Sequence, residues 1–322
     1  MIAGRKLPAA ITFNVSARAG AKMVRATANQ TIITADTFHF NDQWAVQGVL
    51  STSFLRSQSW SSAGVVTSQN STDGVLSPTV SLIYKPVSNL TTYATWARSV
   101  EQGEQAPAGT ANVNQFLDPY NDEEYEIGVK YAIAPKLLAT FALFHMTRPL
   151  AATDALSNIF QVVGTQRNNG AELFLQGDVF SDLSVFGGIT YIDARLLNTG
   201  VPATNGGLVV GVPLFKTDVA LDYHPAFLQG FALTGAVHAE GERAATNINN
   251  SLAPPYATFD VGVRASRTID RHIVTMRFQV LNVGNTFYYS SIADGNIVGS
   301  PGANTAYLGT PRTYLFSLQM TL

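Results

Sequence analysis

The apolar segments of this chain are separated by gaps that alternate between short and long, and this alternation limits the fold more than any other feature. Reading back from Leu322, two-faced segments lie at 314–322, 272–283, 256–266 and 230–240, separated by a long gap (290–306), a tight turn (267–271) and a second long gap (241–255). Further upstream, short connections fall at 225–229, 180–182, 134–136, 85–89 and 41–43, and long ones at 195–213, 148–160, 100–122 and 57–74. Outer-membrane barrels have short turns on one side and long loops on the other. The alternation therefore predicts an antiparallel sheet with all its long loops at one end.

Side chains within these segments alternate between two chemically different faces, because successive residues of a strand point to opposite sides. Tyr125, Ile127 and Val129 alternate with Glu126 and Lys130. The same separation of apolar from charged or polar positions occurs in 215–224, 259–264, 274–280 and 314–322. A lipid-facing Arg or Lys near the bilayer midplane costs about 2–4 kcal/mol. We therefore assign the charged face to a polar interior and the apolar face to lipid.

Composition agrees with this assignment and removes several alternatives. Hydrophobic residues make up 46% of the chain and charged residues 13%, yet no stretch approaches the ~18 consecutive apolar residues of a membrane-spanning helix. Cysteine is absent, which excludes disulfides, zinc–cysteine clusters and thiol nucleophiles. The net charge of −2 gives no reason to expect a nucleic-acid partner. We expect an all-β fold, an antiparallel transmembrane β-barrel of about fourteen strands in a single domain over residues 1–322, in the form of a partial barrel.

The first residues predict a fragment of a longer protein. Residues 1–35 carry five basic side chains and no acidic one, but Pro8, Thr12 and Asn14 interrupt the apolar stretch that an export signal needs. We read 9–17 and 31–40 as two further strands and identify no export signal. Segment 137–147 is apolar on both faces, which suits contact with an inner plug or an inward loop as well as it suits a soluble core.

Motifs of enzymes and metal sites are absent from the sequence. The five histidines, at positions 39, 145, 224, 238 and 272, show no metal-ligand spacing. No phosphate-binding loop, dinucleotide fingerprint or nucleophile elbow occurs. We therefore predict no catalytic residue, no metal ligand and no cofactor, and interpret His224 and His238 as solvated residues of a polar face.

Several motifs resemble those of one family, the TonB-dependent siderophore receptors. They are DTFHFNDQW at 36–44, YEIGVKY at 125–131, GAEL at 170–173, PL at 213–214, LNVGNTFYY at 281–289 and GTPRT at 309–313, in the order found in the family. The resemblance covers residues 31–322 and corresponds to the C-terminal part of the receptor barrel. The final strand also resembles the signal for outer-membrane assembly, although Leu322 replaces the usual final aromatic residue.

The resemblance implies uptake of a ferric siderophore across the bacterial outer membrane, energised through the TonB protein. Receptors of this family resemble barrels of about twenty-two strands with a plugged lumen. This chain shows no plug domain, so any contact with the TonB system would run through a plug that is missing here. The implied partners are a ferric siderophore, outer-membrane lipid and lipopolysaccharide, with iron present only as part of the siderophore.

Two sets of residues follow as candidates. Asn282, Gly284 and Asn285 at one strand end, and Gly309, Pro311 and Arg312 before the last strand, are interpreted as structural devices, because Asn and Gly suit turns and Pro suits a strand entry. The tentative ligand contacts, chosen as aromatic or cationic residues on outer loops and strand ends, are Trp60, Tyr120, Arg148, Arg195, Arg243, Tyr288 and Tyr289. We hypothesise that the three arginines of this set form an electropositive mouth.

Two other functions remain open from the sequence. About fourteen strands could close as a passive outer-membrane pore. Alternatively, the apolar faces could pack against each other in a soluble all-β binding module. Conductance in a planar bilayer would favour the pore, and solubility without detergent would favour the soluble module. A sheet with two open edges in lipid must close on itself, borrow a partner chain or fail to fold, because each unpaired backbone group there costs several kcal/mol.

Overall fold

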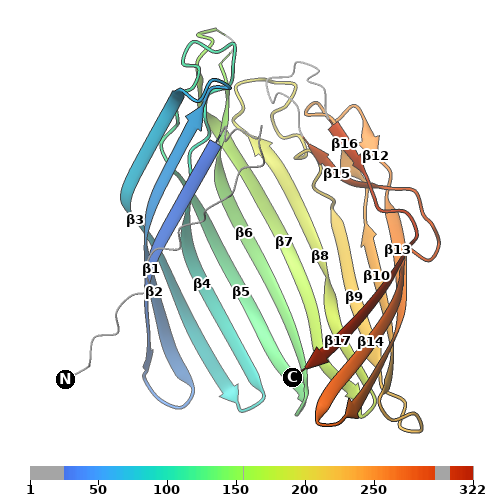
Figure 1. Cartoon of the computed structure of the whole chain (residues 1–322). Helices are drawn as coiled ribbons and strands as arrows, with labels where there is room; N and C mark the ends of the chain where they lie inside the picture. Colours follow the sequence, from blue (N-terminus) through green and yellow to red (C-terminus); the bar gives the residue numbers. More distant parts are fainter. Residues whose placement is uncertain (1–24, 155, 294–304, 322) are drawn as a thin grey trace.

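The described part of the chain is a strongly curved antiparallel sheet that wraps into part of a barrel (Figure 1). The structure is a computed structural model, and it describes residues 25–154, 156–293 and 305–321. The sheet contains 13 strands, each paired with the next in the order β1-β2-β3-β4-β5-β6-β7-β8-β9-β10-β13-β14-β17. Two small two-stranded sheets, β11-β12 and β15-β16, lie in the long loops.

The strands of the large sheet are long. They are β1 (Arg25–His39), β2 (Trp44–Trp60), β3 (Val66–Val87), β4 (Leu90–Glu101), β5 (Tyr120–Ala134), β6 (Leu137–Thr153), β7 (Phe160–Phe180), β8 (Leu183–Leu197), β9 (Phe215–Tyr223), β10 (Phe231–Glu240), β13 (Tyr256–Ile269), β14 (His272–Leu281) and β17 (Thr313–Thr321). The loop strands are β11 (Arg243–Ala244), β12 (Leu252–Ala253), β15 (Tyr289–Ala293) and β16 (Thr305–Leu308).

This architecture confirms the predicted all-β fold, and it confirms the predicted turns and loops except for the long gaps expected at 57–74 and 148–160. Thirteen of the expected strands are present in the sheet, and the remaining one, at 9–17, lies outside the described residues. Short turns gather at the lower end of the view in Figure 1 and long connections at the upper end. Strands β1 and β17 are the two edges and do not pair with each other among the described residues. Because the strands alternate in direction, these two edge strands run the same way.

One expected long gap, 57–74, is wrong. Strand β2 continues to Trp60 and β3 begins at Val66, so a short turn at 61–65 joins them. This hairpin is rich in Ser, Thr, Asn and Gln, which led to its interpretation as a loop. Beyond the lipid, however, a pair of strands needs only its backbone ladder, since water can solvate polar side chains on both faces. The gap at 148–160 is shorter than expected for the same reason, with β6 reaching Thr153 and β7 starting at Phe160.

Apolar side chains cover the outside of the curved sheet. Ile127 is 57% exposed and Phe316 69% exposed, and both belong to the rows assigned to lipid from their alternation. These rows do not converge on a shared interior, which removes the soluble sandwich. The described residues include no helix that is long and apolar enough to cross a membrane.

Segment 137–147 is apolar on both faces because its inner face packs along the wall itself. Phe141 and Leu143 are exposed on the outer side, whereas Ala142 is buried. The inward ring of Phe144 lies over Gly170 of β7, so closely that a side chain at position 170 would collide with it. The glycine of the GAEL motif is therefore required for this close packing of an aromatic ring.

Candidate functional site

Asn282 organises the connection that follows β14. Its backbone has φ +49° and its side chain is almost fully buried, at 3% exposure. The backbone N–H donates to Asp260 Oδ1 at 2.8 Å. Its side-chain Nδ2 donates to the carbonyls of Thr286 (2.8 Å) and Thr310 (3.1 Å), while Oδ1 accepts from the Thr286 N–H at 2.8 Å. One asparagine thus ties the inner wall, the start of the loop and its end together.

The neighbouring motif residues continue this arrangement. Asn285, with φ +52°, accepts the backbone N–H of Arg312 at 3.0 Å. The Pro311 carbonyl accepts from the hydroxyl of Thr313 at 2.9 Å. Gly309 lies under the ring of Tyr288, where any side chain would collide with the ring. Gly284 has ordinary φ and more open surroundings, with only Thr286 Oγ1 close to where a Cβ would lie, at 3.3 Å.

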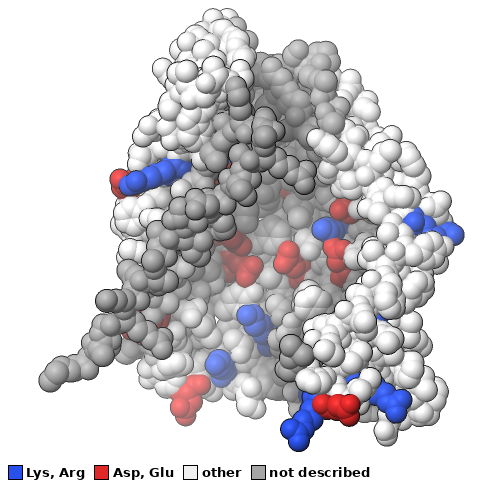
Figure 2. Space-filling model, in the orientation of Figure 1, with Lys and Arg blue, Asp and Glu red and all other residues white. Residues whose placement is uncertain are grey.

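A polar cavity of about 310 Å³ opens on the inner wall beside Asn282. It lies near the long-loop ends of β9, β10, β13 and β14. Figure 2 shows that charged side chains gather on the concave side of the curved sheet. The cavity is lined by Lys216, Asp218, His238, Ala239, Glu240, Tyr256, Thr258, Asp260, Leu281, Asn282, Tyr288, Ser290 and Thr310.

The charged groups of this cavity are paired with one another. His238 lies between two carboxylates, with Nδ1 2.7 Å from Asp218 Oδ1 and Nε2 3.4 Å from Asp260 Oδ2. Lys216 Nζ lies 3.3 Å from Asp218 Oδ2. Thr258, which is 5% exposed, also lines the cavity. The cavity therefore offers aligned hydroxyl, imidazole and carboxylate groups without a large unpaired charge.

Arg243 lies behind one wall of the cavity and contacts residues that form or adjoin that wall. It is 1% exposed, forms an ion pair with Glu240 at 2.9 Å and donates to the Tyr289 carbonyl at 2.6 Å. Its guanidinium lies 5.5 Å from the ring centroid of Tyr256, which stacks on Tyr288 at 4.3 Å. Three of the sequence-predicted ligand residues, Arg243, Tyr288 and Tyr289, are thus brought together here.

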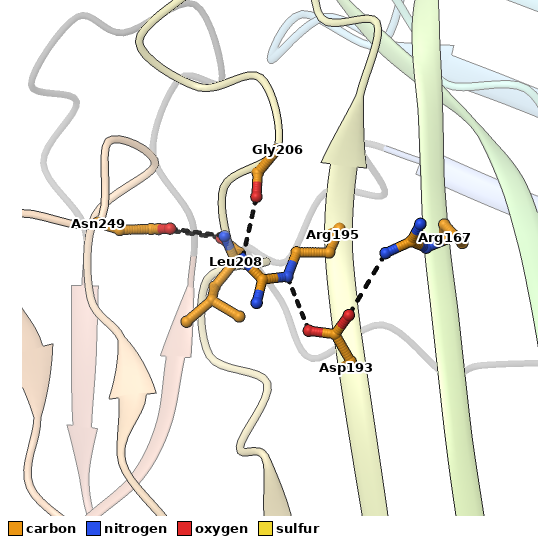
Figure 3. A network of polar contacts seen from close by, with 6 residues as sticks. All are labelled: Arg167, Asp193, Arg195, Gly206, Leu208 and Asn249. Carbon is orange, nitrogen blue, oxygen red and sulfur yellow. Dashed lines mark hydrogen bonds and ion pairs between the residues drawn. The ribbon is translucent and has the colours of Figure 1, made fainter.

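Arg195 belongs to a neighbouring network that joins the long loops (Figure 3). Its Nε lies 2.7 Å from Asp193 Oδ1, and its Nη1 donates to the Gly206 carbonyl at 3.1 Å. Leu208, in the same loop, donates its N–H to Asn249 Oδ1 at 2.5 Å and accepts from Asn249 Nδ2 at 3.0 Å. These bonds connect the loop after β8 to the loop after β10.

The remaining predicted ligand residues lie over other strands. Trp60 ends β2 and pairs with Val66 across the hairpin. Tyr120 is 2% exposed in a small apolar cluster with Ala106, Ala151 and Phe160. Arg148 Nη2 lies 3.0 Å from Glu101 Oε2. The structure does not bring Trp60, Tyr120 or Arg148 to the cavity beside Asn282.

Each arginine of the hypothesised mouth faces a carboxylate, since Arg148, Arg195 and Arg243 pair with Glu101, Asp193 and Glu240. These pairs offset the positive charge locally, and the electropositive mouth stays a prediction. No group of three His, Asp or Glu residues in the described part of the chain is placed to hold a metal ion.

Sequence reasoning missed most of the cavity wall, including His238, Thr258 and Asp218. His238 faces Thr258 directly on β13 and Asp218 directly on β9. The available signal was the alternation itself, which had placed His238 and Asp218 on polar faces. These residues lie side by side because of the strand register, and the register cannot be read from the sequence across the long loops between the strands.

A curved sheet with apolar rows outside, charged rows inside and long loops at one end defines an outer-membrane receptor barrel. The family described as "TonB dependent receptor-like, beta-barrel" matches residues 9–283, and the chain belongs to this family. This assignment confirms the expected family and the expected location in the bacterial outer membrane. The long-loop end is the extracellular end.

Similar proteins include receptors for several metal chelates. The "Ferrichrome receptor FcuA" of Yersinia enterocolitica is 28% identical over 264 residues, which cover 80% of this chain and 34% of the receptor. The "Metal-pseudopaline receptor CntO" of Pseudomonas aeruginosa is 25% identical over 280 residues, which cover 83% of this chain and 38% of the receptor. The crystal structure of BauA, the ferric preacinetobactin receptor from Acinetobacter baumannii, superposes with a TM-score of 0.72 at 25% identity, covering 92% of this chain and 43% of BauA. The chain thus spans well under half the length of these relatives.

Proposed function

We propose that this chain forms part of the ligand-binding wall of a receptor that takes up a metal chelate, a ferric siderophore or a related metallophore, across the outer membrane. The observation that carries the proposal is the polar cavity beside Asn282, at the extracellular end of the inner wall. A chelate that arrives from outside meets this end of the barrel first. Coupling to TonB would run through a plug domain, as the family resemblance implies.

The chemistry of the cavity suits an oxygen-rich chelate. Hydroxamate, catecholate and carboxylate groups need hydrogen-bond donors and aromatic surfaces. The stacked pair Tyr256 and Tyr288 provides the aromatic surface, and the hydroxyls of Thr258 and Ser290 provide polar contacts. A volume of about 310 Å³ lies at the low end of ligand pockets, ~300–1,000 Å³. We therefore assign to it one arm of the chelate rather than the whole molecule.

The other tentative ligand residues enter this proposal with different roles. Arg243 and Tyr289 hold the loops that carry Tyr288, through the bond between the guanidinium and the Tyr289 carbonyl. Arg195 holds the adjacent loop. Trp60, Tyr120 and Arg148 shape a second group of loops across the mouth, where a larger chelate would make its remaining contacts.

Binding of chelates to the full chain in detergent micelles tests the proposal. Ferrichrome and ferric preacinetobactin carrying radioactive iron are the probes, and we expect saturable binding of at least one. Thr258→Val keeps the side-chain shape but removes a hydroxyl from the cavity wall. It should weaken binding about fivefold to tenfold, as one lost hydrogen bond of ~1 to 1.5 kcal/mol implies.

Arg277→Gln is the matched control. Arg277 lies on the inner face of β14, bonds Gln319 at 3.3 Å and is not among the residues that line the cavity. Binding should be unchanged in this variant. Folded chain that binds neither probe, or that binds equally well with Thr258→Val, would refute the proposed site.

A further inference from the structure

The cavity beside Asn282 has an excess of negative charge among the described side chains around it. The charged residues that line it are three carboxylates and one ammonium, namely Asp218, Glu240, Asp260 and Lys216. Arg243, behind the wall, adds a second cation through its ion pair with Glu240. With a neutral imidazole at His238, the excess is one negative charge. The sign of this excess bears on which end groups of a chelate the cavity can accept.

Arg243 is buried behind the cavity wall and cannot receive an anion from the cavity. Its side chain is 1% exposed, Nη1 pairs with Glu240 at 2.9 Å, and Nη2 donates to the Tyr289 carbonyl at 2.6 Å. The guanidinium lies 5.5 Å from the ring centroid of Tyr256, whose ring stacks on Tyr288. The aromatic wall thus already lies against a cation, which the electron-rich faces of such rings favour.

Lys216 is the ammonium that lines the cavity, and it lies among carboxylates. Its Nζ lies 3.3 Å from Asp218 Oδ2, and Lys216 faces Glu240 directly across the ladder. On its other side the same row runs through Thr190 to Glu172, two strands away at about 10 Å. An anionic end group that approached Lys216 would therefore be repelled by the carboxylates around it.

The carboxylates of the cavity, by contrast, are accessible from the lumen. The side chain of Asp218 is 50% exposed and that of Asp260 is 22% exposed. Asp260 accepts the Asn282 N–H at Oδ1, and its Oδ2 lies 3.4 Å from His238 Nε2. Because each carboxylate oxygen can accept more than one hydrogen bond, both side chains can accept further N–H donors from a ligand.

A second cavity of about 310 Å³ lies next to the first, toward the short turns. Asp260 lines both cavities, so its carboxylate lies at the boundary between them. Asp222 also lines the second cavity, whereas the described residues of its lining include no lysine or arginine. Asp222 has its own cation, Arg264, at 3.0 Å. The second cavity therefore supplies no positive charge to balance Asp260.

We propose that the cavity beside Asn282 takes a chelate arm that ends in a protonated nitrogen group and disfavours an arm that ends in a carboxylate. The nitrogen group donates to Asp218 and Asp260, while the metal-binding part of the chelate stays in the wider lumen. This inference rests on the proposed function, because it assigns the charge of the arm that enters the same cavity.

Three forms of one iron chelate test the charge of the arm. Ferrioxamine B ends in a free ammonium group, which acetylation makes neutral and succinylation makes anionic, while the iron centre is unchanged. Binding of the three forms to the full chain in detergent micelles is measured with radioactive iron. We expect the ammonium form to bind about fivefold more tightly than the acetylated form and about tenfold or more than the succinylated form. Added salt should reduce both ratios.

Charge variants of the cavity should change the ratio of ammonium to succinylated affinity in opposite directions. Asp218→Asn leaves Lys216 without its paired carboxylate and should lower the ratio about tenfold. Lys216→Gln removes the ammonium and should raise the ratio about threefold or more. Both side chains are half exposed, so both variants should fold. Arg277→Gln, which lines neither cavity, should leave the ratio unchanged.

The outcomes separate this inference from the proposed function. Equal binding of the three forms, tighter binding of the succinylated form, or a ratio that neither cavity variant changes would overturn the charge assignment and leave the uptake function standing. If the folded chain binds none of the three forms, the charge assignment is also overturned. The uptake function then depends on the binding of ferrichrome and ferric preacinetobactin.

Discussion

Replacing Asn282 with alanine should release the loop that closes the candidate ligand cavity. Asn282→Ala removes the bonds to the Thr286 and Thr310 carbonyls and the bond from the Thr286 N–H. It keeps the backbone bond to Asp260. The variant therefore tests the side chain alone, as the residue that joins both ends of the loop to the wall.

The expected loss of unfolding free energy in Asn282→Ala follows from these contacts. Each lost hydrogen bond is worth ~1 kcal/mol net, and an alanine held at φ +49° costs about 1 kcal/mol or more in backbone strain. The expected loss is therefore about 4 kcal/mol. Asn282→Gly avoids the strain and should cost about 3 kcal/mol, because it still loses all three side-chain bonds.

The free energy of unfolding can be measured by urea titration in detergent micelles, with the migration difference between folded and unfolded barrel on a gel as the signal. Asn285→Ala is the matched control, since Asn285 has φ +52°, is exposed and accepts one bond from the Arg312 N–H. It should cost about 2 kcal/mol. If the Asn282 and Asn285 variants lose equal stability, the assignment of Asn282 as the joining residue is refuted.

Three further predictions concern the wall and the loops. Gly187→Ala should destabilise the barrel by more than ~3 kcal/mol, because φ there is +149° and a Cβ would collide with a backbone carbonyl of β9, whereas Gly48→Ala, with open space around it, should be neutral in the same titration. Arg243→Met should cost about 3–5 kcal/mol, because it leaves Glu240, whose side chain is only 15% exposed, without its partner. Adding Glu240→Gln should restore part of the loss, and loop cleavage by protease would measure both changes. Hydrogen bonds from Ser157 and Leu156 lower the pKa of Asp154. The turn that these bonds hold should therefore be ordered at pH values above the usual pKa of a carboxyl, and it should loosen as the pH falls through the lowered pKa. Amide exchange would measure this pH dependence, and Asp154→Asn should abolish it.

The strands of the barrel were largely predictable because lipid-facing apolar residues alternate along each strand with polar residues that face water. Strand β13 was expected at 256–266 and β14 at 272–283, close to the observed Tyr256–Ile269 and His272–Leu281. The hairpin of β2 and β3 was not predictable in the same way. Its polar residues carry no face preference in water, so the pattern contains no signal for how far the ladder extends.

The cavity was harder to predict than the wall that carries it. His238 was recognisable as a residue of a polar face, but its position between Asp218 and Asp260 requires the register of three strands. Those strands are joined in sequence by connections of very different length. The burial of Arg243 depends likewise on contacts between two loops, which side-chain alternation does not encode.

The separation of charged from apolar residues also specifies the strand register on which the candidate ligand cavity depends. A slip of one residue in β7 would carry Arg167 to the inner face and Glu172 to the outer one, because side chains alternate with a period of two. Glu172 lies within the span that faces lipid, where an ionised side chain is costly. In the polar hairpin of β2 and β3 no such cost applies, and the pairing there shows register shifts between Ser53 and Leu55 and between Ser59 and Trp60. The inner cavity is therefore positioned by this constraint, which holds only where each strand separates apolar from charged residues.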